Sequence, residues 1–141
     1  MTASRILMIG ALVCAASAAT AEVAKVDLGA AELAETPLAG VSSKMISGTM
    51  EDEGAFGALA LMADGSVFPP HSHPDARMSV VVEGTMYLGV GDTVDPTAER
   101  AFEAGSVAIT PAGETHWMAA RGGDVRILEV GTGPTTTDWV Q

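Results

Sequence analysis

The sequence predicts an all-β domain, and three observations lead to that prediction. Throughout residues 44–130, short apolar runs alternate with turns that contain Gly, Pro or Asp, as in β-sandwiches and β-barrels. No part of that stretch has the periodicity of a sustained helix. The chain has a single cysteine, Cys14, and none after it, so a hydrophobic core must stabilise the domain without disulfide bonds.

The first 21 residues have the three-part pattern of a secretory signal. Arg5 precedes an apolar stretch, 6–16, and small residues end at Ala21, which completes an A-x-A cleavage site. The stretch is shorter than the roughly 20 residues that span a bilayer. We therefore expect cleavage between Ala21 and Glu22, a periplasmic or secreted domain, and no stable membrane anchor after cleavage.

Residues 22–43 are expected to form an N-terminal arm or a first strand, and residues 44–141 the folded domain. One short helix is predicted at 30–35, because Ala, Leu and Glu favour helices and Pro37 follows. Predicted strands, each a short apolar run bounded by turn residues, are 45–47, 57–62, 79–83, 86–90, 106–110, 116–119 and 125–130. The longest connection, 92–103, is expected to lie on the surface.

The charge of the chain excludes several partners. The chain has eighteen acidic and seven basic residues, which give a net charge of −11, and the sequence has no basic cluster. Nucleic acid is excluded as a partner because phosphate neutralisation requires gathered Lys or Arg, and an anionic membrane surface is disfavoured for the same reason. The sequence also lacks a recognisable nucleophilic triad and a phosphate-binding loop. A small-molecule ligand or substrate remains the expected partner.

Histidine supplies the strongest functional signal, because the chain has only three. His71 and His73 are two residues apart, so in a strand both imidazoles project from one face. His116 follows a turn, 110–114, and could complete a three-nitrogen face from a neighbouring strand. The alternative is an exposed His-x-His with an unrelated third histidine. Trp117 is expected on the opposite face of its strand, packed against the outside of the sheet.

The residues around the histidines resemble the two motifs of the cupin family. The first motif, G-x5-H-x-H-x3/4-E-x6-G, matches the chain from Gly65 to Gly84 except at its Glu. The second, G-x5-P-x-G-x2-H-x3-N, matches from Gly105 to Ala120 except at its final Asn. The resemblance implies a jelly-roll barrel, the double-stranded β-helix of RmlC-like cupins, often a homodimer. It also implies a metal inside the barrel, held by His71, His73 and His116.

Imidazole ligands limit the choice of metal but do not identify it. Neutral histidines suit iron, copper, zinc and nickel, and the missing carboxylate weakens the case for manganese. Three protein ligands would leave an open position for water or substrate, as in catalytic sites.

Arg77 occupies the Glu position of the first motif, and a guanidinium cannot bind a metal. Three interpretations remain open. The three histidines alone hold the metal, as in three-histidine cupins such as thiol and diketone dioxygenases, and Arg77 clamps an anionic substrate. Alternatively, Arg77 turns outward to Asp75 or Glu83, and water or Glu114 fills the fourth position. In the third interpretation the substitution has abolished metal binding.

The sequence thus supports an exported single-domain cupin with a divalent transition metal, acting as an oxygenase-like enzyme on a small molecule. The alternative is a non-catalytic periplasmic protein that binds a metal or a small ligand, as a sensor or accessory protein. Whether the chain is an enzyme stays open at this point.

Overall fold

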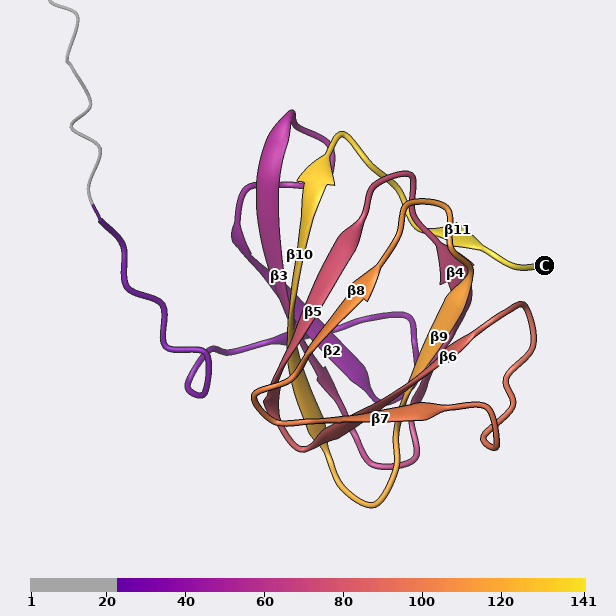
Figure 1. Ribbon diagram of the computed structural model, residues 1–141. Coiled ribbons are helices and arrows are strands. Elements are labelled where there is room, and N and C mark those ends of the chain that lie inside the picture. The colour runs from indigo at the N-terminus through magenta and orange to yellow at the C-terminus, as the bar shows by residue number, and fades with distance from the viewer. Residues whose placement is uncertain (1–22) are drawn as a thin grey trace, which may run out of the picture.

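The computed structural model describes residues 23–141, which form two antiparallel β-sheets that face each other as a barrel (Figure 1). The predicted signal, 1–21, lies outside the described residues. The strands are β1 (Ala34–Glu35), β2 (Val41–Ser47), β3 (Gly54–Met62), β4 (Val67–Ser72), β5 (Arg77–Glu83), β6 (Thr85–Val90), β7 (Arg100–Glu103), β8 (Val107–Thr110), β9 (His116–Ala120), β10 (Val125–Gly133) and β11 (Asp138–Trp139). Residues 23–33 lead into β1 from outside the barrel (Figure 1).

The strand order confirms the all-β, RmlC-like architecture predicted from the sequence. One sheet has six strands in the order β1-β2-β3-β10-β5-β8, and the other has five in the order β11-β4-β9-β6-β7. Many neighbours are distant in sequence because successive connections cross from one sheet to the other. The crossing places β4 beside β9, and these two strands carry His71 and His116.

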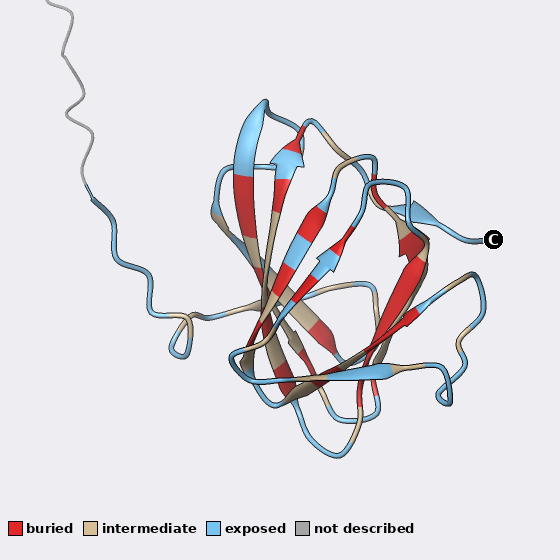
Figure 2. Ribbon diagram, viewed as in Figure 1, coloured by how far each residue is buried: buried red, intermediate tan, exposed pale blue. Residues whose placement is uncertain are grey.

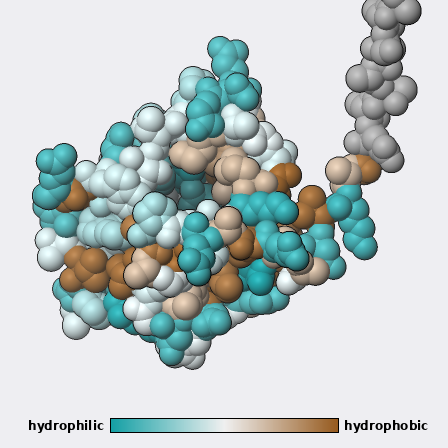
Figure 3. All heavy atoms as spheres, turned by 180° about the vertical axis from the view of Figure 1, so that it is seen from behind, coloured by the Kyte–Doolittle hydropathy of each residue, from teal (hydrophilic) through white to brown (hydrophobic). Residues whose placement is uncertain are grey.

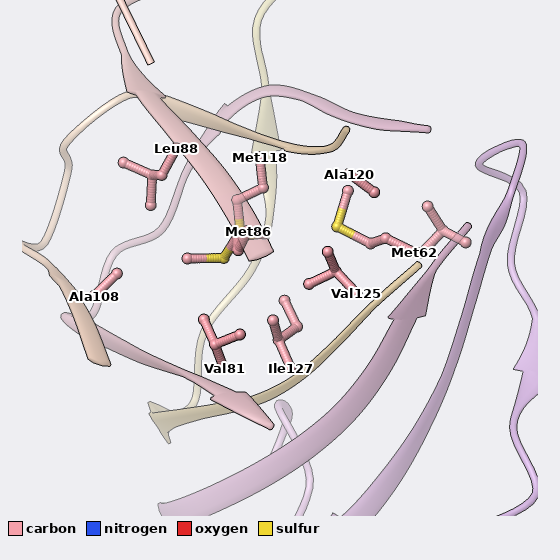
Figure 4. Packing of buried hydrophobic residues seen from close by; sticks show 10 residues of the cluster. Met62, Val81, Met86, Leu88, Ala108, Met118, Ala120, Val125 and Ile127 are labelled. Atoms are coloured by element: carbon pink, nitrogen blue, oxygen red, sulfur yellow. The ribbon is translucent and has the colours of Figure 1, made fainter. Parts of the chain in front are cut away.

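Alternation along the strands directs one face of each sheet into the barrel. On β10, for example, Val125 and Ile127 are buried, whereas Arg126 between them is only partly buried. Figure 2 shows buried segments on both sheets, and Figure 4 shows the side chains that meet between them. The core cluster consists of Val41, Met62, Val81, Met86, Leu88, Ala108, Met118, Ala120, Val125 and Ile127. Removal of these apolar side chains from water is the main source of stability in a domain without disulfides.

The helix predicted at 30–35 is wrong. Its last two residues form β1, in which Ala34 pairs with Ser43 and Glu35 with Ser42 of β2. A six-residue helix is too short to be stable by itself, whereas pairing with β2 satisfies backbone groups directly. The seven predicted strands fall within β2, β3, β5, β6, β8, β9 and β10, with β8 starting one residue later than expected.

The connection 92–103 is more structured than the sequence suggested. Its last four residues form β7, and the side chain of Glu99 is only 1% exposed. Glu99 accepts hydrogen bonds from Trp117 Nε1 and from the Arg121 guanidinium. As expected, Trp117 lies on the face of β9 opposite His116, where the connection covers it.

The face seen from behind is mixed in hydropathy (Figure 3). In the view from behind, hydrophobic residues are interspersed with hydrophilic ones (Figure 3). Within residues 23–141, no helix is long and apolar enough to span a membrane.

Gly89 leaves the space that Trp117 occupies, so Gly89→Ala should destabilise the domain. A Cβ atom at position 89 would overlap the indole ring of its cross-strand neighbour. We expect urea unfolding to show a loss of about 1–3 kcal/mol, the usual range for overpacking. Gly57→Ala is the control, because a Cβ there would lie 3.4 Å from Ile46 Cγ1. Equal unfolding free energies for the two variants would contradict this assignment.

Candidate metal centre

The three histidines meet in one buried cluster inside the barrel. His71 on β4 and His116 on β9 are direct cross-strand partners, with ring centroids 4.3 Å apart. His73 follows β4 immediately, and its centroid lies 4.8 Å from that of His71. One ligand nitrogen from each ring lies within 4.8 Å of the other two. All three side chains are nearly inaccessible, with exposures of 0% for His71, 4% for His73 and 2% for His116.

Two prolines before the cluster sit in a β-bulge. Phe68 pairs with Met118 and His71 with His116, so Pro69 and Pro70 together lie opposite the single residue Trp117. Proline has no N–H to give to a ladder, and a bulge is one of the few places where a paired strand tolerates it. The prolines therefore extend β4 up to His71 without breaking the sheet, and the sequence analysis did not predict this strand.

Main-chain carbonyls orient all three imidazoles. Nδ1 of His71 lies 2.6 Å from the Pro69 oxygen, and Nδ1 of His116 lies 2.9 Å from the Glu114 oxygen. Nδ1 of His73 lies 2.8 Å from the oxygen of Thr136. Because a carbonyl only accepts, we place the ring proton on Nδ1 of each histidine. Each Nε2 then carries a free lone pair.

His73 has a second polar neighbour at the same nitrogen. Its Nδ1 lies 3.1 Å from Nη2 of Arg77, which can only donate. The Thr136 oxygen is closer, at 2.8 Å, and can only accept. We therefore assign the proton of His73 to the bond with Thr136, and the approach of Arg77 is then a contact without a hydrogen bond.

The lone pairs fit a metal ion better than any protein partner. Nε2 of His71 and of His73 is buried, and neither has a hydrogen-bond partner among residues 23–141. A buried polar atom without a partner costs about 1–3 kcal/mol, so such atoms are rare unless they serve a function. Hydrogen bonding of the opposite nitrogen to a carbonyl is also the usual arrangement of metal-bound histidine. The donor set therefore fits a transition metal.

Burial keeps the imidazoles of His71 and His116 neutral, which is the form that binds metals. Burial lowers the pKa of His71 from 6.5 to about 3, against the opposing effect of the Pro69 carbonyl. The pKa of His116 is lowered as well, again mainly by burial. Both rings therefore stay unprotonated at neutral pH with or without a bound ion.

Arg77 lies inside the barrel beside the cluster, with an exposure of 2%. Its Nε donates to Asp75 Oδ1 at 3.0 Å, and its Nη1 donates to Glu129 Oε1 at 2.6 Å. The guanidinium also lies over the Phe56 ring, 4.8 Å from its centroid. Nη2 is 3.4 Å from Thr135 Oγ1. Two carboxylates thus balance the positive charge that occupies the Glu position.

This placement differs from the outward orientation considered from the sequence. Arg77 does pair with Asp75, but it points inward, and its second carboxylate is Glu129 rather than Glu83. Glu114, considered as a fourth ligand, has an exposed side chain and contributes its main-chain oxygen to His116. No described carboxylate joins the three histidines in the cluster.

Asp75 is held in place as an anion. Burial alone would raise its pKa, but hydrogen bonds from Thr135 Oγ1 and the Thr132 amide, together with Arg77, outweigh burial and lower the pKa below 3.8.

Glu129 is the site residue that the sequence analysis missed. The sequence analysis did not single out Glu129, yet this residue faces the interior with 16% of its side chain exposed. The signal was present in the alternation of β10, since Glu129 shares a face with Val125 and Ile127. Recognising that face as buried would have placed this carboxylate near the histidines.

A cavity of about 160 Å³ adjoins the cluster. His73, Arg77 and Glu129 form its polar wall, and Ser43 and Thr137 add two hydroxyl groups. The rest of its lining is apolar, with Met62, Phe68, Met118 and Ile127 among the contributors. The cavity is large enough for a small organic molecule next to the histidines.

Comparisons with known proteins agree with this architecture. The family model described as Cupin domain matches residues 58–131, which include all three histidines. The germin-like protein subfamily T member 2 of Arabidopsis thaliana is 38% identical over 57 residues, which are 40% of this chain. The matched segment is 26% of that relative, so the likeness concerns only part of it.

Solved structures share the fold at low sequence identity. The polyketide cyclase RemF from Streptomyces resistomycificus superposes with a TM-score of 0.69 and 18% identity, covering 85% of this chain and 87% of RemF. An RmlC-like cupin from Shewanella frigidimarina gives a TM-score of 0.59 and 17% identity, covering 74% of this chain and 85% of that one. These likenesses establish the fold alone.

The lowered pKa of His71 predicts a loss of stability in mild acid. The unfolded chain takes up a proton near pH 6.5, whereas the folded chain resists protonation until about pH 3. The contribution of neutral His71 to stability is therefore fully present above the pKa of the unfolded chain and declines as the pH falls below that pKa. Urea unfolding of metal-free protein between pH 7 and pH 4.5 should show this decline. In His71→Asn, which keeps a donor for Pro69 but cannot titrate, the slope should be shallower; an identical slope would contradict the prediction.

Proposed function

We propose that this chain, which belongs to the cupin family, holds a divalent transition metal between the Nε2 atoms of His71, His73 and His116. The observation that carries the proposal is the pair of buried, partnerless Nε2 atoms on His71 and His73 within the described chain, residues 23–141. Their orientation is fixed by carbonyl contacts to the opposite nitrogens, so the site is preorganised for an ion.

The donor set favours iron, copper, zinc or nickel. Three neutral nitrogens leave open coordination positions, which is typical of catalytic rather than structural sites. A bound ion would supply Lewis-acid activation or, with iron, dioxygen chemistry at those positions. Main-chain carbonyls orient the ligand nitrogens, burial shields the cluster from water, and Arg77 and Glu129 lie at the wall of the adjoining cavity.

We further propose that the protein is an enzyme that acts on a small molecule, specifically in an oxygenase-like reaction. The cavity beside the histidines supports this proposal. An organic ligand bound in it would lie next to His73 in mostly apolar surroundings. That the structurally similar RemF is a polyketide cyclase supports catalysis by analogy only.

A non-catalytic metal- or ligand-binding protein is the second candidate. The pairing of Arg77 with Asp75 and Glu129 favours it, because the guanidinium proposed as an anion clamp is already engaged by two anions.

Export and assembly are further parts of the proposal. The pattern of residues 1–21 supports a cleavable signal and a periplasmic or secreted location. A homodimer is proposed from the resemblance to other cupins.

The metal site is tested by His73→Asn. The amide can still donate to the Thr136 carbonyl but removes one ligand nitrogen, so metal content after purification should fall at least tenfold, in line with the loss of a ligand rather than of an outer partner. Metal analysis of full-length protein, purified as expressed and after incubation with iron, copper, zinc or nickel, measures this directly.

Ser72→Ala is the matched control, because Ser72 lies between the two histidines and on the opposite face of the strand. It should retain wild-type metal content. A wild-type protein that takes up none of the four metals would end the proposal.

A further inference from the structure

The volume of the cavity matches a ligand of about one ring. An apolar cavity of about 150 Å³ takes up benzene, and the cavity beside His73 has about 160 Å³. Its apolar lining includes Phe68 and the side chains of Met62, Met118 and Ile127. Such a lining selects a ligand that is mostly apolar.

The polar wall offers an acceptor that no described residue uses. Glu129 lines the cavity, and its Oε1 receives the hydrogen bond from Arg77 Nη1. Among residues 23–141, Oε2 of Glu129 receives no hydrogen bond. A carboxylate oxygen accepts strongly and cannot donate, so it favours a ligand hydrogen-bond donor.

Arg77 does not counteract the preference of Glu129 for a ligand that donates a hydrogen bond. Its Nε and Nη1 are directed at Asp75 and Glu129. Its Nη2 is close to Thr135 and to His73. Arg77 pairs with two carboxylates, of which Glu129 lies in the cavity wall and Asp75 does not, so the wall has a net formal charge of zero and its cation is already paired. A ligand anion at this wall would therefore meet the Glu129 carboxylate and find no unpaired side-chain cation.

From these contacts we infer that the cavity binds a neutral, one-ring molecule whose hydroxyl donates to Glu129 Oε2. This ligand class deepens the proposed function and rests on one part of it, that a small molecule enters the cavity. It replaces the anionic substrate expected when Arg77 was considered a clamp. Glu129 thus acts as a specificity-determining residue, and Arg77 holds it in place.

Three probes of similar size test the inference: phenol, fluorobenzene, which lacks the donor, and benzoate, which is an anion. Affinities are measured by calorimetry on full-length, zinc-loaded wild type and Glu129→Gln. The amide introduced by this substitution can still accept from Arg77 while it turns an NH2 group toward the cavity. In Glu129→Gln the affinity for phenol should fall by roughly tenfold, as expected for loss of a hydrogen bond to a charged group. The affinity for benzoate should rise, and the affinity for fluorobenzene should stay unchanged.

Glu83→Gln is the matched control, since it removes one negative charge from the exposed end of β5. It should leave all three affinities at wild-type values. Unchanged phenol binding in Glu129→Gln would show that the metal rather than Glu129 selects the hydroxyl, and would overturn the inference.

Other outcomes separate this inference from the proposed function. Equal weakening of phenol and fluorobenzene would show a damaged cavity without donor selection and would also overturn the inference. Zinc content is measured in every sample, so failure of metal binding is seen independently of probe affinity. If zinc binds and no probe does, the inference fails together with the small-molecule part of the proposed function.

Discussion

The hydrogen bond from each imidazole Nδ1 to a main-chain carbonyl is the interaction on which the site depends. It fixes the tautomer and leaves each Nε2 available, in a cluster where one ligand nitrogen from each ring lies within 4.8 Å of the other two. Two of the carbonyls lie two residues before their histidine, in the bulge at Pro69 and in the turn at Glu114. The third belongs to Thr136, after β10, so the chain beyond the last long strand contributes to the cluster.

The replacement of the motif's Glu by Arg77 is accommodated by a set of neighbours. Gly131 is essential for space, because a Cβ atom there would lie 2.5 Å from Asp75 Oδ2 and 2.9 Å from Arg77 Cδ. Asp75 and Glu129 supply the opposite charge, and the Phe56 ring covers the guanidinium. Breaking such a pair would leave an uncompensated buried charge, so these residues are interdependent.

The sequence predicted what depends on local pattern and on motif spacing. The strands with clear apolar runs and the buried three-histidine cluster were found, because a period of two and two turn-bounded motifs determine them. β4 was missed because Pro69 and Pro70 argue against a strand unless a bulge is known. β1 and β11 have two residues each, and only their pairing partners make them strands.

The inward position of Arg77 could not be predicted, because it depends on partners from other strands. Asp75 is two residues away, but Glu129 is 52 residues away and lies near it only through the pairing of β5 with β10. When the strand pairing is not known, an arginine in the Glu position of the motif indicates only that the carboxylate ligand is lost.

The carboxylate of the motif has in effect been relocated rather than removed. Arg77, Asp75 and Glu129 together have a formal charge of −1, the same as a single Glu at the ligand position would have. Burial is the main cause of the lowered pKa of His116, and beside it Glu129 raises this pKa whereas Arg77 lowers it, so the two charges oppose each other at the cluster. A divalent ion between the histidines would therefore encounter a similar net charge but one fewer ligand. The substitution would thus leave a coordination position open on a bound ion without making the interior electropositive, so Arg77 is compatible with a metal.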